Sequence, residues 1–422
     1  MARIAFAWEL GGEFGHAMAC SALARMLHGR GHHIAFIFRE LHQLSFLADT
    51  SAYEVFQAPV HLVEDKGAPL PASYADILLR CGYSDPRHVT GLLGGWFALL
   101  GRWKPDIVIG DSAPTALLAA RLLGLKRVAY GNGFAIPPQL SPLPAFRYDE
   151  PVSRERVVEA DARALAASNA ALARFGGAPM RHLCEQFQTD EDFLATFPEL
   201  DSYGNRPLSG YWGPRFSVES GASVHWPAGP GKRVIVYVKK SLPQFDALLA
   251  ALVASPHRIA AFIPEIDKAQ RDALSSPRRI VSDRPMRLAP LLKECDLFVS
   301  AGGNVCVGTL MSGVPQLVLP SQYEQYITAQ RIAQIGVGLW HFKASPAEIA
   351  ASLQRIPGEP RFAEAARAFS RRYPTYSPVE QQRRMVMRIE QIIGAPSRWP
   401  ALPLPGAAPI LSPTSTGQGA AG

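Results

Sequence analysis

Cysteine is scarce in this sequence, and long hydrophobic runs are missing. The 422 residues include only 5 cysteines, which are scattered and form no Cys-x-x-Cys pair. This spacing argues against structural zinc and against a disulfide framework, and it favours a reducing compartment. No apolar run approaches the roughly 20 residues that span a bilayer, and the first apolar segment, Arg3 to Trp8, is too short for a signal peptide. We therefore expect a cytoplasmic protein.

Basic residues outnumber acidic ones, yet they form no dense block. The net charge of +7 is carried mostly by arginine, without the interleaved aromatic residues of a nucleic-acid surface. Nucleic-acid binding is therefore not expected. An anionic substrate and peripheral contact with an anionic membrane face both stay open.

Strand-like and helix-like segments alternate through most of the chain. Such alternation predicts an α/β fold with parallel sheets. The expected strands are Ile4 to Trp8, His33 to Phe38, Pro105 to Gly110, Arg127 to Gly131, Val234 to Val238, Arg258 to Ile263, Asp296 to Ser300 and Gln316 to Leu319. The expected helices include His16 to Arg30, Ala113 to Leu123 and Val152 to Phe175.

The alternation breaks between Tyr211 and Lys232, where Gly, Pro and Ser are frequent. Composition of this kind marks a linker between domains. We expect an N-terminal domain over residues 1–215, a linker over 216–231 and a second domain over 232–377. The Pro-, Gly- and Ala-rich end of the chain, residues 396–422, is expected to be a disordered tail.

A glycine-rich turn, Gly11-Gly-Glu-Phe-Gly-His16, follows the first expected strand. Glycines permit a sharp turn, and the amino end of the next helix presents free backbone amides. Open α/β sheets bind ligands at the carboxyl ends of their strands, where His16 falls. The alternative is a plain turn with His16 capping the helix. Glu9 and Glu13 flank the turn, either assisting proton transfer or standing as ordinary exposed loop carboxylates.

A second turn, Ser300-Ala-Gly-Gly-Asn304, follows a strand in the C-terminal half, and Gly313-Val-Pro315 comes shortly after it. Small residues between a strand and a helix let backbone amides approach a diphosphate without clashes from β-carbons. A plain turn would also use glycine, but this pattern contains more than a turn requires. The segment is therefore predicted to bind phosphate.

Together these motifs resemble the UDP-glycosyltransferase family. Residues 15–32 are similar to the opening motif GHxxPxxxLAxxLxxxGH, with Ala19 in place of the proline. Cys295 to Trp340 resembles the donor-binding signature, and Tyr211-Trp-Gly-Pro214 is similar to the motif that closes the N-terminal domain. The resemblance implies the GT-B fold, in which two Rossmann-like domains face each other across a cleft.

The resemblance spans most of residues 1–393 and implies an inverting glycosyltransferase that uses a nucleotide-sugar donor. His16 would be the general base that takes the proton of the acceptor hydroxyl. Asp111 would be the carboxylate that orients this histidine, and an N-cap on the following helix is the alternative for it. The resemblance also implies a C-terminal helix over 378–395 that crosses back to the first domain.

The same resemblance assigns the donor side. Gly302, Gly303 and Asn304 would face the diphosphate. Glu324 and Gln325 would hold the hydroxyls of the donor sugar, where the family has Asp-Gln; an exposed pair on a surface helix is the alternative. No cofactor and no metal are expected, because we identify nothing in the sequence that resembles the Asp-x-Asp used to hold a divalent ion, and helix dipoles with backbone amides can neutralise the diphosphate.

Two positions depart from the family pattern. The phosphate-binding histidine of the family falls on Ser300, and its ribose-binding glutamate falls on Gly308. Ser300 offers one uncharged hydrogen bond in place of a histidine, and Gly308 has no side chain to accept one. The identity of the donor nucleotide is therefore left open.

The acceptor side is predicted from aromatic residues near His16. Phe14 and Phe134 are the candidates for an apolar acceptor pocket, while Trp8 and Tyr130 are explained equally well as core. The expected acceptor is a hydroxyl of a small molecule or of a lipid-linked compound. Two other functions stay open on the same fold: a non-catalytic sugar-nucleotide-binding protein and a sugar-nucleotide epimerase.

Overall fold

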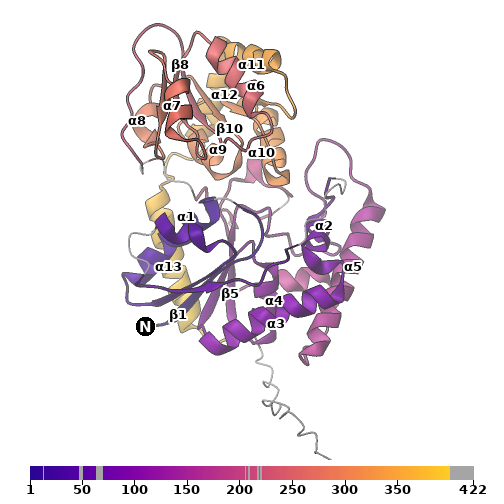
Figure 1. Ribbon diagram of the computed structural model, residues 1–422. Coiled ribbons are helices and arrows are strands. Elements are labelled where there is room, and N and C mark those ends of the chain that lie inside the picture. The colour runs from indigo at the N-terminus through magenta and orange to yellow at the C-terminus, as the bar shows by residue number, and fades with distance from the viewer. Residues whose placement is uncertain are drawn as a thin grey trace, which may run out of the picture.

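The computed structural model describes residues 1–12, 14–46, 51–62, 70–204, 206–207, 210–215, 218 and 221–399. These residues form two α/β domains of the same topology (Figure 1). The N-terminal domain contains β1 (Arg3–Trp8), α1 (Phe14–His28), β2 (His33–Phe38), β3 (Glu54–Gln57), α2 (Tyr74–Leu78), α3 (Pro86–Trp103), β4 (Ile107–Asp111), α4 (Pro114–Leu122), β5 (Lys126–Gly131), α5 (Arg154–Arg174) and β6 (Glu191–Leu194).

The C-terminal half contains β7 (Arg233–Tyr237), α6 (Phe245–Ala254), β8 (Arg258–Phe262), α7 (Lys268–Leu274), β9 (Arg279–Ser282), α8 (Leu288–Leu292), β10 (Leu297–Ser300), α9 (Gly303–Leu310), β11 (Gln316–Val318), α10 (Tyr323–Gln334), β12 (Gly338–Trp340), α11 (Pro346–Gly358), α12 (Pro360–Arg371) and α13 (Pro378–Gly394). The strands expected from the sequence are all present, with ends that differ by one or two residues.

The N-terminal sheet has 6 parallel strands in the order β3-β2-β1-β4-β5-β6. Side chains of a strand alternate between its two faces. In β1, Phe6 accordingly packs in the cluster formed with α1 and α13, while Ala7 packs in the cluster formed with α3 and α4. Helices therefore cover both faces, which explains why the strands are apolar along their length.

The C-terminal sheet has 6 strands in the order β12-β11-β10-β7-β8-β9. Counted within its own domain, this is the strand order of the N-terminal sheet. In both sheets the first and fourth strands are neighbours, because β1 pairs with β4 and β7 pairs with β10. The order reverses at this point, and the crevice beyond the carboxyl ends of these strands is where open α/β sheets bind ligands.

The described residues of the connection between the domains are packed against the C-terminal domain. Val218, Val224 and Trp226 contact the hydrophobic cluster around Met286 in the C-terminal domain. The backbone N–H of Ala222 donates to the Pro285 carbonyl at 2.8 Å. Much of the segment predicted as a linker is thus attached to the surface of the second domain.

Helix α13 returns to the N-terminal domain, where Figure 1 shows it in yellow beside α1. Its Met385 and Ile389 are buried in the same cluster as Phe6. Its Glu390 pairs with Arg30 at 2.7 Å. None of the described helices combines the length and apolarity of a membrane span.

The chain continues along the N-terminal domain for a few residues after α13. The Trp399 indole donates to Asp190 at 3.0 Å, and the Arg127 guanidinium lies 3.7 Å from the centroid of the Trp399 ring. Residues 396–399 of the segment predicted as a disordered tail are therefore attached to the domain. The rest of that segment, 400–422, lies outside the described residues.

Candidate active site

The turns that follow the central strands of the two sheets meet between the domains. The side-chain nitrogen of Asn304, in the first turn of α9, lies 3.3 Å from the point where a β-carbon on Gly15 would sit. Close by, Asn132 after β5 donates a hydrogen bond to the Glu324 carboxylate of α10. The turn that carries the predicted catalytic base, Gly11 to His16, and the turn predicted to bind the donor, Ser300 to Asn304, thus lie at one site.

His16 and Asp111 are brought together by the pairing of β1 with β4. Register places Trp8 opposite Asp111, so the turn after β1 starts level with the last residue of β4. His16 Nδ1 lies 3.0 Å from Asp111 Oδ1. This leaves Nε2 as the ring nitrogen that can accept a proton, with Asp111 on the opposite side to stabilise the resulting imidazolium.

The imidazole of His16 stacks on an aromatic ring and has a glycine beside it. The ring of Trp8 stacks on it, with centroids 5.1 Å apart and planes 19° apart. Gly11 has a φ of 79°, and a β-carbon there would lie 3.1 Å from His16 Nε2. Glycine therefore serves two needs at this position, a left-handed backbone and open space beside the nitrogen that would act as base.

The carboxyl group of Asp111 is buried and is held as the anion. Arg215 Nη1 lies 2.6 Å from Asp111 Oδ2, which leaves Oδ1 for His16. Burial by itself would raise the pKa of Asp111, but the charges of Arg215 and His16 outweigh burial and hold that pKa well below its usual range. The next residue, Ser112, has a φ of 48°, a strained conformation of the kind found at active sites.

The surroundings of two charged residues at this site were not predicted from the sequence. Arg215 directly follows the closing motif Tyr211–Pro214, and nothing local in the sequence indicates that it reaches β4. Glu9 was expected either to assist proton transfer or to be an exposed loop carboxylate; it is buried and accepts a hydrogen bond of 2.8 Å from the Thr115 N–H at the start of α4. Burial raises the pKa of Glu9 to about 7, although hydrogen bonds from Thr115 oppose the shift. Glu13 lies outside the described residues.

On the donor side, two consecutive glycines with positive φ form the entrance to α9. Gly302 has a φ of 103°, and a β-carbon there would lie 3.3 Å from the β-carbon of Gln325. Gly303 has a φ of 71°, and a β-carbon there would meet no atom within 4 Å. The backbone at Gly303 is thus open to the space in front of it, as an approach by a diphosphate requires.

Other residues predicted on the donor side are buried or bonded within the domain. Ser300 is fully buried, and its hydroxyl accepts a hydrogen bond of 3.2 Å from the Gly302 N–H. Gly308 is buried inside α9. The side chain of Gln325 is buried and accepts hydrogen bonds from the Ser321 N–H at 3.0 Å and the Ser321 hydroxyl at 2.9 Å. The backbone of this turn and Glu324 therefore stay the candidates for contact with a donor.

Most of the aromatic residues considered for the acceptor pocket are also packed within the domain. Trp8 and Tyr130 are buried in the core. Phe134 is half-buried, and its ring stacks on Phe146 with centroids 4.7 Å apart and planes 2° apart. One face of Phe134 is therefore covered by protein. Phe14 begins α1, and its side chain lies outside the described part of the chain.

One Asp-x-Asp does occur in the sequence, far from both turns. Asp190 immediately precedes β6 and Asp192 lies within it, at the amino edge of the sheet, whereas His16 lies at the carboxyl edge. The Asp190 carboxylate accepts the Arg127 N–H at 2.8 Å, and Asp192 accepts the Thr189 hydroxyl at 2.5 Å. The Asp190 carboxylate thus joins β5 to the start of β6, and the Asp192 carboxylate is engaged within its own segment.

Comparisons with known proteins identify a family that matches part of the chain and a relative that covers more of it. Residues 246–381 match the family described as erythromycin biosynthesis protein CIII-like, C-terminal domain. L-demethylnoviosyl transferase of Streptomyces niveus is 29% identical over 319 residues, which are 71% of this chain and 75% of that protein.

Solved structures share the arrangement of the two domains. The calicheamicin glycosyltransferase CalG4 matches with a TM-score of 0.67 at 18% identity, covering 94% of this chain and 99% of that one. The spinosyn rhamnosyltransferase SpnG in complex with thymidine diphosphate matches with a TM-score of 0.61 at 18% identity, covering 91% of this chain and 100% of that one. SpnG has also been solved with spinosyn aglycone, with a TM-score of 0.60 to this chain at 18% identity and coverage of 93% and 100%. At these identities the likeness establishes the fold, and it confirms the predicted GT-B arrangement.

Proposed function

We propose that this chain, a glycosyltransferase of the GT-B type, moves a sugar from a nucleoside-diphosphate donor to a hydroxyl of a small-molecule acceptor with inversion at the anomeric carbon. The observation that carries the proposal is the placement of the His16–Asp111 pair. His16 Nδ1 lies 3.0 Å from the buried Asp111 carboxylate, and the first turn of α1 touches Asn304 at the start of α9.

The chemistry follows from this geometry. His16 Nε2 takes the proton of the acceptor hydroxyl as its oxygen attacks the anomeric carbon from the side opposite the diphosphate. The bond from that carbon to the diphosphate oxygen breaks in the same step, and the configuration inverts. Asp111 stabilises the imidazolium that forms.

The leaving diphosphate is held by the turn from Gly302 to Asn304. Gly303 opens the backbone to the cleft, and the amino end of α9 supplies N–H groups and the positive end of the helix dipole. Glu324, whose carboxylate bonds to Asn132 across the domains, is placed to exchange that partner for the hydroxyls of the donor sugar. We propose that this charge compensation works without a metal, so that turnover survives addition of EDTA.

Thymidine diphosphate is the nucleotide we favour. SpnG binds it on the same fold, and Gly308 lacks the carboxylate with which the UDP-glycosyltransferase family holds a ribose. For the acceptor we favour an aglycone, because SpnG has been solved with spinosyn aglycone. A lipid-linked acceptor at a membrane face is the competing outcome.

The test has two stages. A thermal-shift series with dTDP, UDP and GDP identifies the nucleotide, since a ligand that binds the native state raises the unfolding midpoint. Turnover of the matching sugar nucleotides with aglycone and lipid-linked acceptors then follows, and NMR coupling constants report the anomeric configuration of the product. A product that retains the donor configuration would overturn the inverting mechanism. A nucleotide that binds without any transfer would favour a non-catalytic binding protein, and conversion of the sugar itself would favour an epimerase.

A further inference from the structure

The Asp111 carboxylate is shared by two basic side chains that come from opposite ends of the sequence of the N-terminal domain. His16 lies on α1 and takes Oδ1, while Arg215 comes from the segment that leaves the domain and takes Oδ2. The Arg215 side chain is only 3% exposed. Its guanidinium also lies 4.7 Å from the centroid of the Tyr130 ring and donates to the Tyr130 carbonyl at 3.4 Å.

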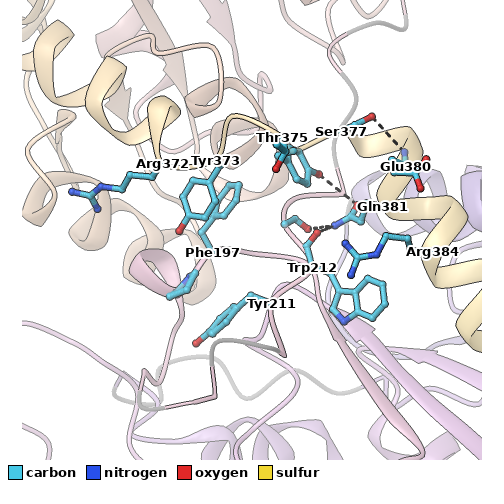
Figure 2. A pocket seen from close by; sticks show the side chains of 13 residues that line it. Phe197, Tyr211, Trp212, Arg372, Tyr373, Thr375, Ser377, Glu380, Gln381 and Arg384 are labelled. Atoms are coloured by element: carbon cyan, nitrogen blue, oxygen red, sulfur yellow. Dashed lines mark hydrogen bonds between the residues drawn. The ribbon is translucent and has the colours of Figure 1, made fainter.

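The backbone just before Arg215 is fixed by the segment that returns from the C-terminal domain. The Gln381 amide of α13 donates to the Trp212 carbonyl and, at 2.6 Å, to the Gly213 carbonyl. The Tyr376 hydroxyl donates to the Pro214 carbonyl at 2.5 Å. Figure 2 shows Gln381 beside Trp212, at the edge of a pocket lined by both segments. The position of Arg215 thus depends on contacts made by both crossings between the domains.

We propose that Arg215 is a positioning residue for the catalytic base, which connects the interdomain crossing to the orientation and charge balance of the Asp111–His16 pair. The inference rests on the proposed function of His16 as the base. Arg215 touches no reacting atom and acts through Asp111.

The effect of Arg215 on His16 has two parts. Its bond to Oδ2 fixes the plane of the carboxylate so that Oδ1 faces His16. Its positive charge also offsets the negative charge of Asp111, so that loss of Arg215 would leave an uncompensated carboxylate beside the His16 ring.

The other titratable groups facing Asp111 do not supply this charge. Cys20 on α1 has its Sγ 3.8 Å from Asp111 Oδ2, and Tyr130 lies on β5. Burial raises the pKa of the Cys20 thiol well above its usual value and also raises the pKa of Tyr130. Both groups are therefore neutral near neutral pH. Arg215 and His16 are then the groups that balance the negative charge of the Asp111 carboxylate.

The experiment compares Arg215→Gln, Arg215→Lys and a matched control, Arg206→Gln. Arg206 forms a similarly buried pair with Asp201 at 2.8 Å in the same domain and does not touch His16. In Arg215→Gln we expect the acidic limb of the pH profile of kcat/KM to move up by about one unit, a roughly tenfold loss on the acidic side of the limb that vanishes on the plateau above it. Arg215→Lys should keep the limb in place, because the charge stays, and should lower kcat only. Arg206→Gln should leave the limb where it is.

A second readout needs no substrate. The ring resonances of His16, assigned by their loss in His16→Asn, should titrate at higher pH in Arg215→Gln than in the parent. A further comparison sets Asp111→Asn against the double variant Asp111→Asn/Arg215→Gln. Because Arg215 acts through the carboxylate, the His16 titration should not differ between these two variants. The double variant has no unpaired charge at positions 111 and 215, so the test stays available if Arg215→Gln alone fails to fold. An unchanged titration midpoint overturns the role of Arg215, whereas a parent protein without any turnover overturns the proposed function and leaves this readout intact.

Discussion

The fourth strand of each domain ends at the same point of the same topology, but with different chemistry. In the N-terminal domain β4 ends at Asp111, which pairs in register with Trp8, and in the C-terminal domain β10 ends at Ser300, which pairs with Tyr237. Asp111 is ionised between Arg215 and His16. Ser300 is uncharged, and its hydroxyl is used within its own turn.

In the proposed mechanism, this difference lets one architecture serve two tasks. The N-terminal turn would supply side chains, since proton transfer needs a base and a partner for its charge. The C-terminal turn would leave the backbone open, since a diphosphate is bound best by backbone N–H groups at the start of a helix. Substitutions at the first turn should therefore affect turnover, and substitutions at the second should affect donor affinity.

The largest effect is expected at His16. His16→Ala should lower turnover by roughly 10²–10⁴-fold and leave donor affinity intact, because in the proposed mechanism His16 meets the acceptor hydroxyl and not the donor. Asp111→Asn should act in the same direction, and the double variant should lose little more than the worse single variant. Steady-state kinetics and isothermal titration with the nucleotide measure the two quantities, with His33→Ala, an exposed histidine at the start of β2, as control. Near-normal turnover of His16→Ala would refute the mechanism.

Next in size is the effect at Gly303. Gly303→Val should abolish nucleotide binding, because the side chain would fill the open space in front of the backbone. The matched control is Gly336→Val, since Gly336 has a similar φ of 76° and lies away from the turn, between α10 and β12. Both variants carry the same backbone strain, and only the first should lose the thermal shift caused by the nucleotide. Equal loss in both would mean that strain, and not blocked access, explains the result.

A smaller effect, on stability alone, is expected from Glu9. Its pKa rises from 4.5 to about 7 on folding, so the folded state holds the proton more tightly than the unfolded state. The resulting stabilisation is complete below pH 4.5 and is lost as the pH rises to 7, a change on the order of 3 kcal/mol. Glu9→Gln should remove this loss while still accepting the bond from Thr115. Urea unfolding at pH 5 and pH 8 measures it, and an equal decline in parent and variant would contradict the prediction.

The smallest effect is expected at Ser300. Ser300→Ala removes one buried hydrogen bond to the Gly302 N–H, which should cost about 1 kcal/mol of stability. Donor affinity should fall by less than about fivefold, because Ser300 is fully buried and its hydroxyl is engaged with Gly302. Isothermal titration decides the matter. A loss of more than tenfold would mean that Ser300 reaches the phosphate after all, and the contrast with Asp111 would weaken.

Local pattern was sufficient to predict the central strands and the two turns, but it missed the short strands β3, β6, β9 and β12. Strand and helix periodicity located β1, β4, β7 and β10, and glycines with positive φ do stand at Gly11, Gly302 and Gly303. Resemblance to known motifs singled out His16 and Asp111, which the structure places 3.0 Å apart. The direction of the Ser300 and Gln325 side chains was not predictable, because a position in a motif does not tell which face of an element packs inward.

By itself the sequence determined the doubly repeated α/β fold and the positions where the backbone must turn without side chains, since these depend on neighbours within a few residues. Only the tertiary structure decided which charges meet. Arg215 reaches Asp111 across 104 residues of sequence, and Glu9 becomes buried because α4 begins over it. Ionisation of a buried group depends on the groups that surround it in space, and these neighbours cannot be read from the order of residues in the sequence.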